Sequence, residues 1–249
     1  MAALDDVFGL HAVEALLRQS PGRVESLQVQ SGRVDARMQT LLDQAARANI
    51  PVTRLSRRDL DAQAGGATHQ GVIARAHPVA TLGEKDLPDV VMAPRGGGPV
   101  LLLVLDGVTD PHNLGACLRT GDAAGVTAVI APRDRAVGLT PVVRKVASGA
   151  AESVPFIQVT NLARTLDLLK DLGVWTVGTT GEAETGLYDA DLTGPAALVL
   201  GAEGKGMRRL TAERCDALVR LPMHGQVESL NVSVAAGVCL YEAVRQRGA

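Results

Sequence analysis

From Val100 onward the chain alternates short apolar stretches with segments of helical spacing. The apolar stretches predict strands at Val100–Leu105, Thr127–Ala131, Val154–Val159, Val174–Thr179, Ala196–Gly201 and Ala217–Leu221. The remaining segments predict helices at Asn113–Ala124, Pro141–Ala147, Leu162–Asp171, Lys205–Glu213 and Val232–Arg247. The strands are apolar throughout rather than at every second residue, which is typical of a parallel sheet covered on both faces. The pattern therefore predicts an α/β fold.

Prolines and glycines concentrate between His77 and Pro99 and interrupt any regular periodicity there. Clusters of this kind mark connectors between domains. We therefore expect a first domain at 1–76, a linker at 77–99 and a second domain at 100–249. The alternative is one long loop within a single domain, although structureless loops of that length are uncommon in compact units.

The segment before this linker has the pattern of a small α/β unit. It predicts helices at Leu10–Gln19 and Asp35–Ala48, a short helix capped by Ser56, and strands at Val24–Gln30, Ile50–Leu55 and Gly71–Ala76. A unit of this size can bury a core of its own.

Charge and composition exclude several classes of protein. Lys and Arg number 25 against 27 Asp and Glu, a net charge of −2, so the chain has no overall basic coat for nucleic acid, although local basic patches remain possible. Aromatic residues make up 2%, which argues against base stacking on aromatic platforms. The three cysteines lack CxxC spacing, so we expect a reducing cytoplasm and no metal. An acidic N-terminus and the short run Val100–Leu105 predict a soluble protein without a membrane segment.

The first candidate functional segment, residues 105–120, follows a strand and opens a helix. Its polar side chains are therefore expected at the carboxyl edge of the sheet, where open α/β folds bind ligands. Asn113 is a plausible helix cap, and Arg119 falls in the second turn. The alternative is an ordinary cap and a solvated charge.

The second candidate segment, residues 200–209, has three glycines in six residues, Gly201, Gly204 and Gly206. Such a turn lets a ligand approach the main-chain amides. Gly206 follows Lys205 where a Walker A loop needs Ser or Thr, and Arg209 stands where a GxGxxG fingerprint needs glycine. The alternative is a glycine turn that binds nothing.

The third candidate segment, residues 221–237, is a polar loop that runs into a helix apolar on nearly every face. Such a helix is usually buried within the domain or against a second subunit. Ser229 and Asn231 place a hydroxyl and an amide beside its positive end. The alternative is plain N-capping by either residue.

Taken together, the three segments closely resemble the SpoU/TrmH branch of the SPOUT RNA methyltransferases. The family's motifs occur in order as Asp110–Thr120, Leu200–Met207 and Leu221–Ala235, within a resemblance that covers Val100 to Arg247. The N-terminal unit, with Val7–Val13 and Thr68–Val72, is similar to the substrate-binding domain of the subgroup that methylates guanosine 2′-oxygens of large-subunit (23S) ribosomal RNA.

The resemblance implies a SPOUT-type parallel sheet with a C-terminal trefoil knot that binds S-adenosylmethionine, and an N-terminal RNA-binding domain of ribosomal-protein-L30-like fold. It also implies a homodimer with the active site at the subunit interface and ribosomal RNA as partner. Topology rules alone would predict an unknotted doubly wound sheet. The alternatives are a transfer-RNA ribose methyltransferase of the same family, a non-catalytic RNA-binding assembly factor, and a conventional nucleotide enzyme, which lacks its signatures here.

The resemblance also assigns roles to single residues. Arg119 is implied as the central catalytic residue, and we expect it to grip a phosphate and stabilise charge on the 2′-oxygen, because its high pKa makes it a poor base. The supporting residues are Asn113, Glu203, Ser229 and Asn231, and the cofactor is expected around Gly201, Leu221 and Leu230. Glu203 either orients Arg119 or accepts a substrate hydrogen bond. Candidate RNA contacts, unless they are simply solvated charges, are Arg54, Arg57, Arg58, Arg133, Arg135, Arg144, Lys145, Arg208 and Arg209.

Overall fold

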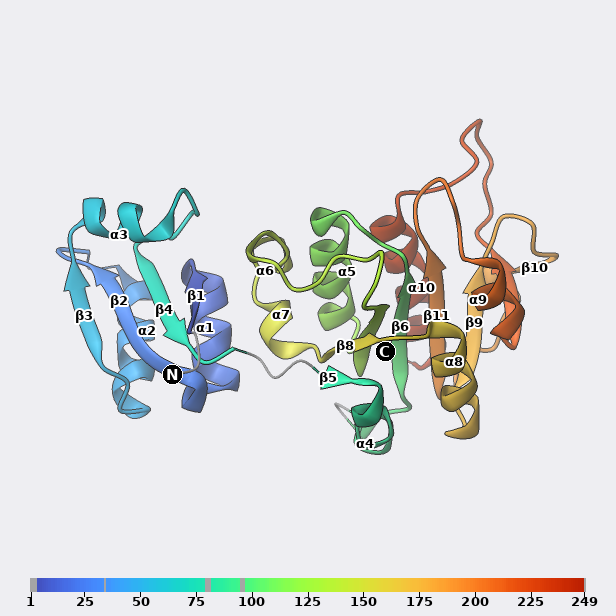
Figure 1. Cartoon of the computed structure of the whole chain (residues 1–249), viewed down its shortest axis with the longest axis horizontal. Coiled ribbons are helices and arrows are strands. Elements are labelled where there is room, and N and C mark those ends of the chain that lie inside the picture. Colours follow the sequence, from blue (N-terminus) through green and yellow to red (C-terminus); the bar gives the residue numbers. More distant parts are fainter. Residues whose placement is uncertain (1–3, 34, 79–81, 95–96, 249) are drawn as a thin grey trace. The chain divides into compact units, whose positions relative to one another are not determined.

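The chain forms two compact units, comprising residues 1–80 with 148–153, and 81–147 with 154–249. The structure is a computed structural model that describes residues 4–33, 35–78, 82–94 and 97–248 (Figure 1). Each unit has its own core of buried aliphatic side chains. Among the described residues, no helix combines the length and the apolar character needed to cross a bilayer.

The smaller unit is a four-stranded sheet in the order β1-β4-β2-β3. Its strands are β1 (Asp5–Phe8), β2 (Val24–Gln30), β3 (Val52–Leu55) and β4 (Val72–Ala76), and its helices are α1 (Leu10–Gln19), α2 (Ala36–Arg47), α3 (Arg57–Ala64) and α7 (Ala150–Ser153). Ser56 caps α3 as expected, its hydroxyl accepting from the backbone N–H of Asp59 at 3.2 Å. The sequence pattern misses β1, since two of its four residues are aspartates.

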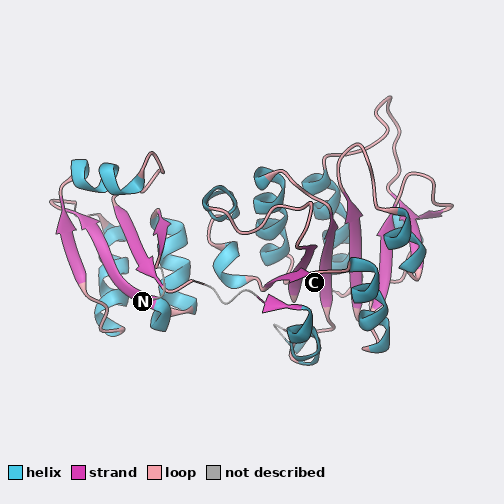
Figure 2. Cartoon of the chain, in the orientation of Figure 1, coloured by secondary structure: helices cyan, strands magenta, loops and turns pink. Residues whose placement is uncertain are grey.

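The larger unit is an eight-stranded sheet in the order β10-β12-β9-β11-β6-β7-β8-β5, with every neighbouring pair parallel (Figure 2). Its strands are β5 (Leu82–Gly83), β6 (Leu101–Asp106), β7 (Ala128–Pro132), β8 (Phe156–Val159), β9 (Trp175–Thr179), β10 (Thr185–Gly186), β11 (Ala196–Gly201) and β12 (Ala217–Arg220). Its helices are α4 (Leu87–Met92), α5 (Pro111–Ala123), α6 (Pro141–Ala147), α8 (Leu162–Asp171), α9 (Arg209–Arg214) and α10 (Val232–Gln246). The parallel α/β architecture is therefore confirmed.

Two expectations need correction. The proposed linker 77–99 contains β5 and α4, and Leu87 and Val91 of α4 are buried in the core of the larger unit. Pro88 lies in the first turn of α4, where proline removes no helical hydrogen bond, so it does not mark a break. The helix expected at Lys205–Glu213 begins only at Arg209, because residues 202–206 form a glycine turn instead.

The end of α10 is fastened to the loop that leads into β11. Glu242 accepts hydrogen bonds at 2.8 Å from Arg245 and Gln246, and Gln246 also bonds the backbone of Ala190 and Leu192. Arg247 donates to four carbonyl oxygens, those of Pro99, Val100, Leu192 and Gly194. These bonds tie the last helix to the starts of two central strands.

Glu242→Gln should change the acid stability of the protein. The hydrogen bonds from Arg245, helped by Gln246, outweigh burial and lower the pKa of Glu242 to about 2. A carboxyl whose folded pKa lies below its unfolded value stabilises the fold above the unfolded pKa, about 4.3. That contribution disappears as the pH falls towards 2. In urea unfolding, the variant should therefore have a lower free energy of unfolding than the native protein at pH 7, and this difference should shrink below pH 4. A difference that stays constant with pH would contradict the prediction.

Gly115→Ala should destabilise the larger unit, whereas Gly121→Ala in the same helix should not. A Cβ at Gly115 would lie 2.6 Å from Cβ of Val146 and 2.9 Å from the carbonyl oxygen of Val143, so α6 would have to move. At Gly121 the nearest atom would be at an ordinary 3.5 Å. Overpacking typically costs about 1–3 kcal/mol, while a helical Gly→Ala exchange gains about 0.5–1 kcal/mol. Denaturant unfolding of both variants measures the contrast.

Candidate active site

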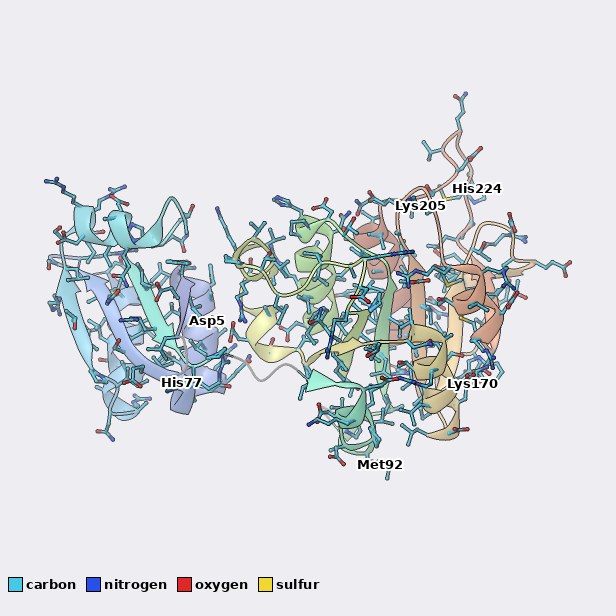
Figure 3. The ribbon with its side chains drawn as sticks, in the orientation of Figure 1. Asp5, His77, Met92, Lys170, Lys205 and His224 are labelled. Carbon is cyan, nitrogen blue, oxygen red and sulfur yellow. The ribbon has the colours of Figure 1, made fainter. Side chains whose placement is uncertain are left out.

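A pocket of about 630 Å³ opens at the carboxyl ends of β9, β11 and β12. It is lined by Thr179, Thr180, Gly181, Glu182, Leu200, Gly201, Ala202, Glu203, Gly204, Lys205, Gly206, Leu221, Met223, Glu228, Ser229, Leu230, Val232 and Ala235. Figure 3 labels Lys205 and His224, which lie on the loops after β11 and β12. Open parallel sheets bind ligands at this edge, so the second and third candidate segments meet where a ligand is expected.

The floor of the pocket is a turn that only glycine allows. A Cβ on Gly201 would overlap the backbone of Gly206 and Met207. Gly206 N donates to Ala202 O at 2.9 Å, and Gly204 and Gly206 have positive φ angles of 72° and 64°. The turn therefore brings main-chain groups to the pocket surface without side chains in the way.

A buried carboxylate holds the far end of this turn. Asp106, at the end of β6, accepts from the backbone N–H of Arg208 at 2.8 Å and lies 3.3 Å from Nε of the same residue. The Asp106 side chain is fully buried. Arg208 is therefore paired within the fold, which argues against the expected RNA contact. The sequence carries a signal for Asp106, a carboxylate directly after an apolar strand, although the predicted site residues do not include it.

Asn231 joins the three candidate segments. Its Nδ2 donates to Oδ1 of Asn113 at 2.9 Å and to Oε1 of Glu203, and its Oδ1 accepts from Ser233 N at 2.9 Å and Ser233 Oγ at 2.6 Å. Glu203 also accepts from the backbone N–H of Val232 at 3.3 Å. Asn231 thus caps α10 and at the same time fixes two site side chains.

Asn113 is not a helix cap. Helix α5 begins at Pro111, and Asp110 caps it through a 2.8 Å bond from His112 N to Oδ1. Asn113 therefore lies inside the first turn, with its side chain free to reach Asn231. The predicted pocket residues Gly201, Leu221, Ser229 and Leu230 all line the cavity. Sequence reasoning missed residues 179–182 and Ser233.

Arg119 lies apart from this group. It is exposed on α5, does not line the pocket, and has no hydrogen bond or ion pair with any residue that the structure describes. Of the other candidate cations, Arg209 pairs with Glu213 at 2.5 Å and Arg57 lies 3.9 Å from Asp61. Arg54, Arg58, Arg133, Arg135 and Lys145 are exposed and make no side-chain bond within the described residues.

The pocket suits a cation with a flat apolar part. Glu182, Glu203 and Glu228 line it against one cation, Lys205. Leu221, Leu230 and Val232 offer apolar cover, and a pocket of this volume accommodates a nucleoside-sized molecule.

Two kinds of chemistry receive no support from the described residues. Burial raises the pKa of Cys117, Cys215 and Cys239 to about 12, so these thiols stay protonated near neutral pH and are poor nucleophiles. Within the parts of the chain that the structure describes, no group of three or more His, Cys, Asp or Glu side chains is arranged to hold a metal ion.

Two known families match most of the chain. The SpoU rRNA Methylase family matches residues 100–241, and the RNA 2′-O ribose methyltransferase substrate-binding domain matches residues 7–82. The chain belongs to the SpoU rRNA methylase family. Both the resemblance seen in the three motifs and that of the N-terminal unit are confirmed.

Curated relatives of this SpoU protein match it over its whole length. The 23S rRNA (guanosine-2′-O-)-methyltransferase RlmB of Pseudomonas syringae pv. tomato is 58% identical and covers 100% of this chain and 98% of its own. The protein of the same name from Vibrio cholerae is 55% identical, covering 97% of this chain and 96% of its own.

Solved structures have the same fold. An RNA 2′-O ribose methyltransferase superposes with a TM-score of 0.78 at 31% identity, covering 98% of this chain and 89% of the other. The SpoU methyltransferase AviRb of Streptomyces viridochromogenes, in complex with the cofactor AdoMet, gives a TM-score of 0.79 at 24% identity, covering 98% and 91%. The second likeness concerns the fold alone.

Asn231→Asp should destabilise the site in a pH-dependent way. The new carboxylate would keep the cap oxygen for Ser233 but would replace the Nδ2 donor by an oxygen facing Glu203 and Asn113. Two adjacent carboxylates share a proton, so the folded-state pKa of the pair should rise above its unfolded value. The free energy of unfolding, measured with denaturant, should therefore fall by about 1–3 kcal/mol at pH 8. The deficit should shrink at lower pH, where the pair takes up a proton. Asn231→Ser, which keeps a capping oxygen without the charge, is the control; a pH-independent deficit in Asn231→Asp would contradict the contact.

Proposed function

We propose that this protein transfers a methyl group from S-adenosylmethionine to the ribose 2′-hydroxyl of a guanosine in 23S ribosomal RNA. The observation that carries the proposal is the hydrogen-bonded junction of the three motif segments, in which Asn231 bonds both Asn113 and the pocket residue Glu203. Full-length likeness to proteins named as 23S rRNA (guanosine-2′-O-)-methyltransferases supports the substrate class.

The cofactor residues follow from the pocket lining. Backbone around Gly201 would read the polar edge of the adenine, Leu221 and Leu230 would cover its faces, and the carboxylates would balance its positive charge. When bound, S-adenosylmethionine supplies a methyl group already activated on sulfur, whose C–S bond breaks as the ribose 2′-oxygen gains the methyl and loses its proton. A donor activated in this way needs no metal.

The chain's own residues then have to orient the hydroxyl and handle its proton. Glu203 is held through Oε1 by Asn231 and by the N–H of Val232. Its Oε2 accepts no hydrogen bond from a described residue and is free to receive one from the ribose hydroxyl. Ser229 lines the same pocket and offers a second polar group. Correct alignment alone contributes about 7–11 kcal/mol to such transfers.

Arg119 is assigned to the phosphate beside the target ribose, where it would stabilise the charge that develops on the 2′-oxygen. Since it lies outside its own chain's pocket, we propose that the protein is a homodimer in which Arg119 serves the partner's site. Val234 and Tyr241, two turns apart on α10, are each 51% exposed and offer an apolar ridge for the second copy. Helix α5, which carries Arg119, packs against α10.

A C-terminal trefoil knot is part of the same proposal. Strand β12 lies outside β9, whereas the following helix α10 packs back against β11 and α5. The C-terminal end of α10 is hydrogen-bonded to the loop 190–194. If the chain passes beneath this loop as it returns from β12 to α10, the backbone is knotted. Residues 1–76 are proposed as the RNA-binding domain, with Arg54 and Arg58 as exposed cations, and the cytoplasm as the place of action.

Arg119→Ala should lower methylation of 23S rRNA by at least about a hundredfold while leaving cofactor affinity unchanged. Arg119→Lys should recover part of the rate, because it keeps the charge without the planar fork. Labelled cofactor, RNA from a strain that lacks the gene, and mapping of the labelled ribose measure the rate and the target. Arg214→Ala, which removes an exposed arginine of α9 outside the proposed RNA-binding domain, is the matched control. If Arg119→Ala lost methylation rate and cofactor binding equally, the role assigned to Arg119 would be wrong. Labelled transfer RNA would identify transfer RNA as the substrate in place of 23S rRNA. RNA binding by the native protein without any labelling would indicate an assembly factor.

Mixed dimers test where Arg119 acts. Neither Arg119→Ala nor Glu203→Gln alone should support methylation. If Arg119 serves the partner's pocket, a heterodimer of the two variants contains one site with both groups intact and regains activity. If Arg119 serves its own pocket, both sites stay defective and the mixture is as inactive as its parents.

A further inference from the structure

A second cavity, of about 480 Å³, lies in the larger unit beside the amino ends of β9, β11 and β12, at the opposite edge of the sheet from the catalytic pocket. Its walls are mostly small or apolar; they are formed by Gly173, Trp175, Thr185, Ala190, Asp191, Gly194, Pro195, Ala217 and Val219. Figure 1 shows this part of the sheet beside β10, at the end remote from β8. Nothing in the methyl-transfer chemistry uses this cavity.

The cavity contains the chain's one tryptophan in an exposed setting. Trp175 is 51% exposed, although it begins a strand whose next three residues are buried. Indole is the best aromatic face for a cation, and an exposed indole beside a small-walled cavity leaves that face accessible.

Asp191 is the one charged residue in the cavity lining. Its Oδ1 accepts from the hydroxyl of Thr193 at 2.6 Å and from Thr193 N at 3.0 Å. These bonds hold the pKa of Asp191 below its usual value, so the group is ionised at neutral pH. Its Oδ2 makes no hydrogen bond to a described residue.

The charge in the cavity lining is negative. Asp191 carries it, Asp189 lies two residues before it, and residues 184–191 contain no Lys or Arg. Two arginines border the segment, but both are bound to carbonyl oxygens: Arg220 to Ala183 and Glu184 at 2.6 and 2.7 Å, and Arg247 to Leu192 and Gly194 at 2.9 and 2.6 Å. Bonds to carbonyl oxygens leave the charge of these guanidiniums in place, so the attraction for a cationic group in this cavity comes from Asp191, which also repels the phosphates of RNA.

We infer that this cavity binds an arginine side chain from a basic segment of a protein partner, with the guanidinium stacked on Trp175 and paired with Asp191. A planar guanidinium can do both at once, because its faces stack on aromatic rings while its edge donates to a carboxylate. Lysine offers a charge but no plane. The site is independent of the proposed methyl transfer.

Fluorescence of the full-length protein provides a direct test, because all tryptophan emission comes from Trp175. Titration with N-acetyl-arginine amide should change the emission saturably. The matched citrulline derivative, which has nearly the same shape without the charge, should bind at least about tenfold more weakly, and Asp191→Asn should weaken the arginine derivative by a similar factor. Asp89→Asn, which removes an exposed carboxylate on α4, is the control and should have no effect.

Several results would overturn the inference. Equal responses to the arginine and citrulline derivatives would do so, as would an unchanged affinity for the arginine derivative in Asp191→Asn. An oligouridylate that changes the Trp175 emission more strongly than arginine does would indicate RNA instead. An emission change that depends on protein concentration alone would indicate a second copy in the cavity. Methylation of RNA by Asp191→Asn should remain at the native rate, so failure here leaves the proposed function untouched and the reverse also holds.

Discussion

The side-chain amide of Asn231 connects segments that lie up to 118 residues apart in the sequence, and the arrangement of the site depends on it. An amide can do this because it donates and accepts at once: its oxygen accepts from the N–H of Ser233, the second residue of α10, while its nitrogen donates to Asn113 and Glu203. An aspartate could cap the helix equally well but has no hydrogen to donate, and a serine has one where the Asn231 amide donates two. Helix capping and site assembly are therefore performed by a single side chain, and Ser233 fixes its rotamer through a second bond to the same oxygen.

Much of the larger unit could be predicted from its sequence. All six strands expected there are present, and β11 has the expected bounds, because continuous apolar runs have few other places to go in a folded chain. Helix ends were predicted less well. Asn113 and Asp110 are both good capping residues, and only the start of α5 at Pro111 decides between them. The sequence pattern does not predict helix α4, because a proline usually marks a break, whereas in the first turn of a helix it costs no hydrogen bond.

In the candidate site, the sequence predicts which residues take part better than it predicts where each lies. The residues of the glycine turn and of the loop before α10 were found because their types are unusual in their positions, and they line one pocket. Position in space could not be predicted for Arg119, since an arginine on a small-residue helix is compatible with a buried site, a solvated surface or an interface between copies. Its exposure, together with the apolar ridge of α10, favours the third.

The four carbonyl oxygens that hold Arg247 come from residues 99, 100, 192 and 194, which enter the two central strands. The acceptors of these four bonds are synthesised well before their donor, Arg247. A nascent chain that has not yet emerged as far as residue 247 therefore lacks these bonds, however well its sheet has formed. The bonds of Arg247 can therefore form only after residue 247 has left the ribosome, and a bulky fusion attached close behind it would have to leave room for them.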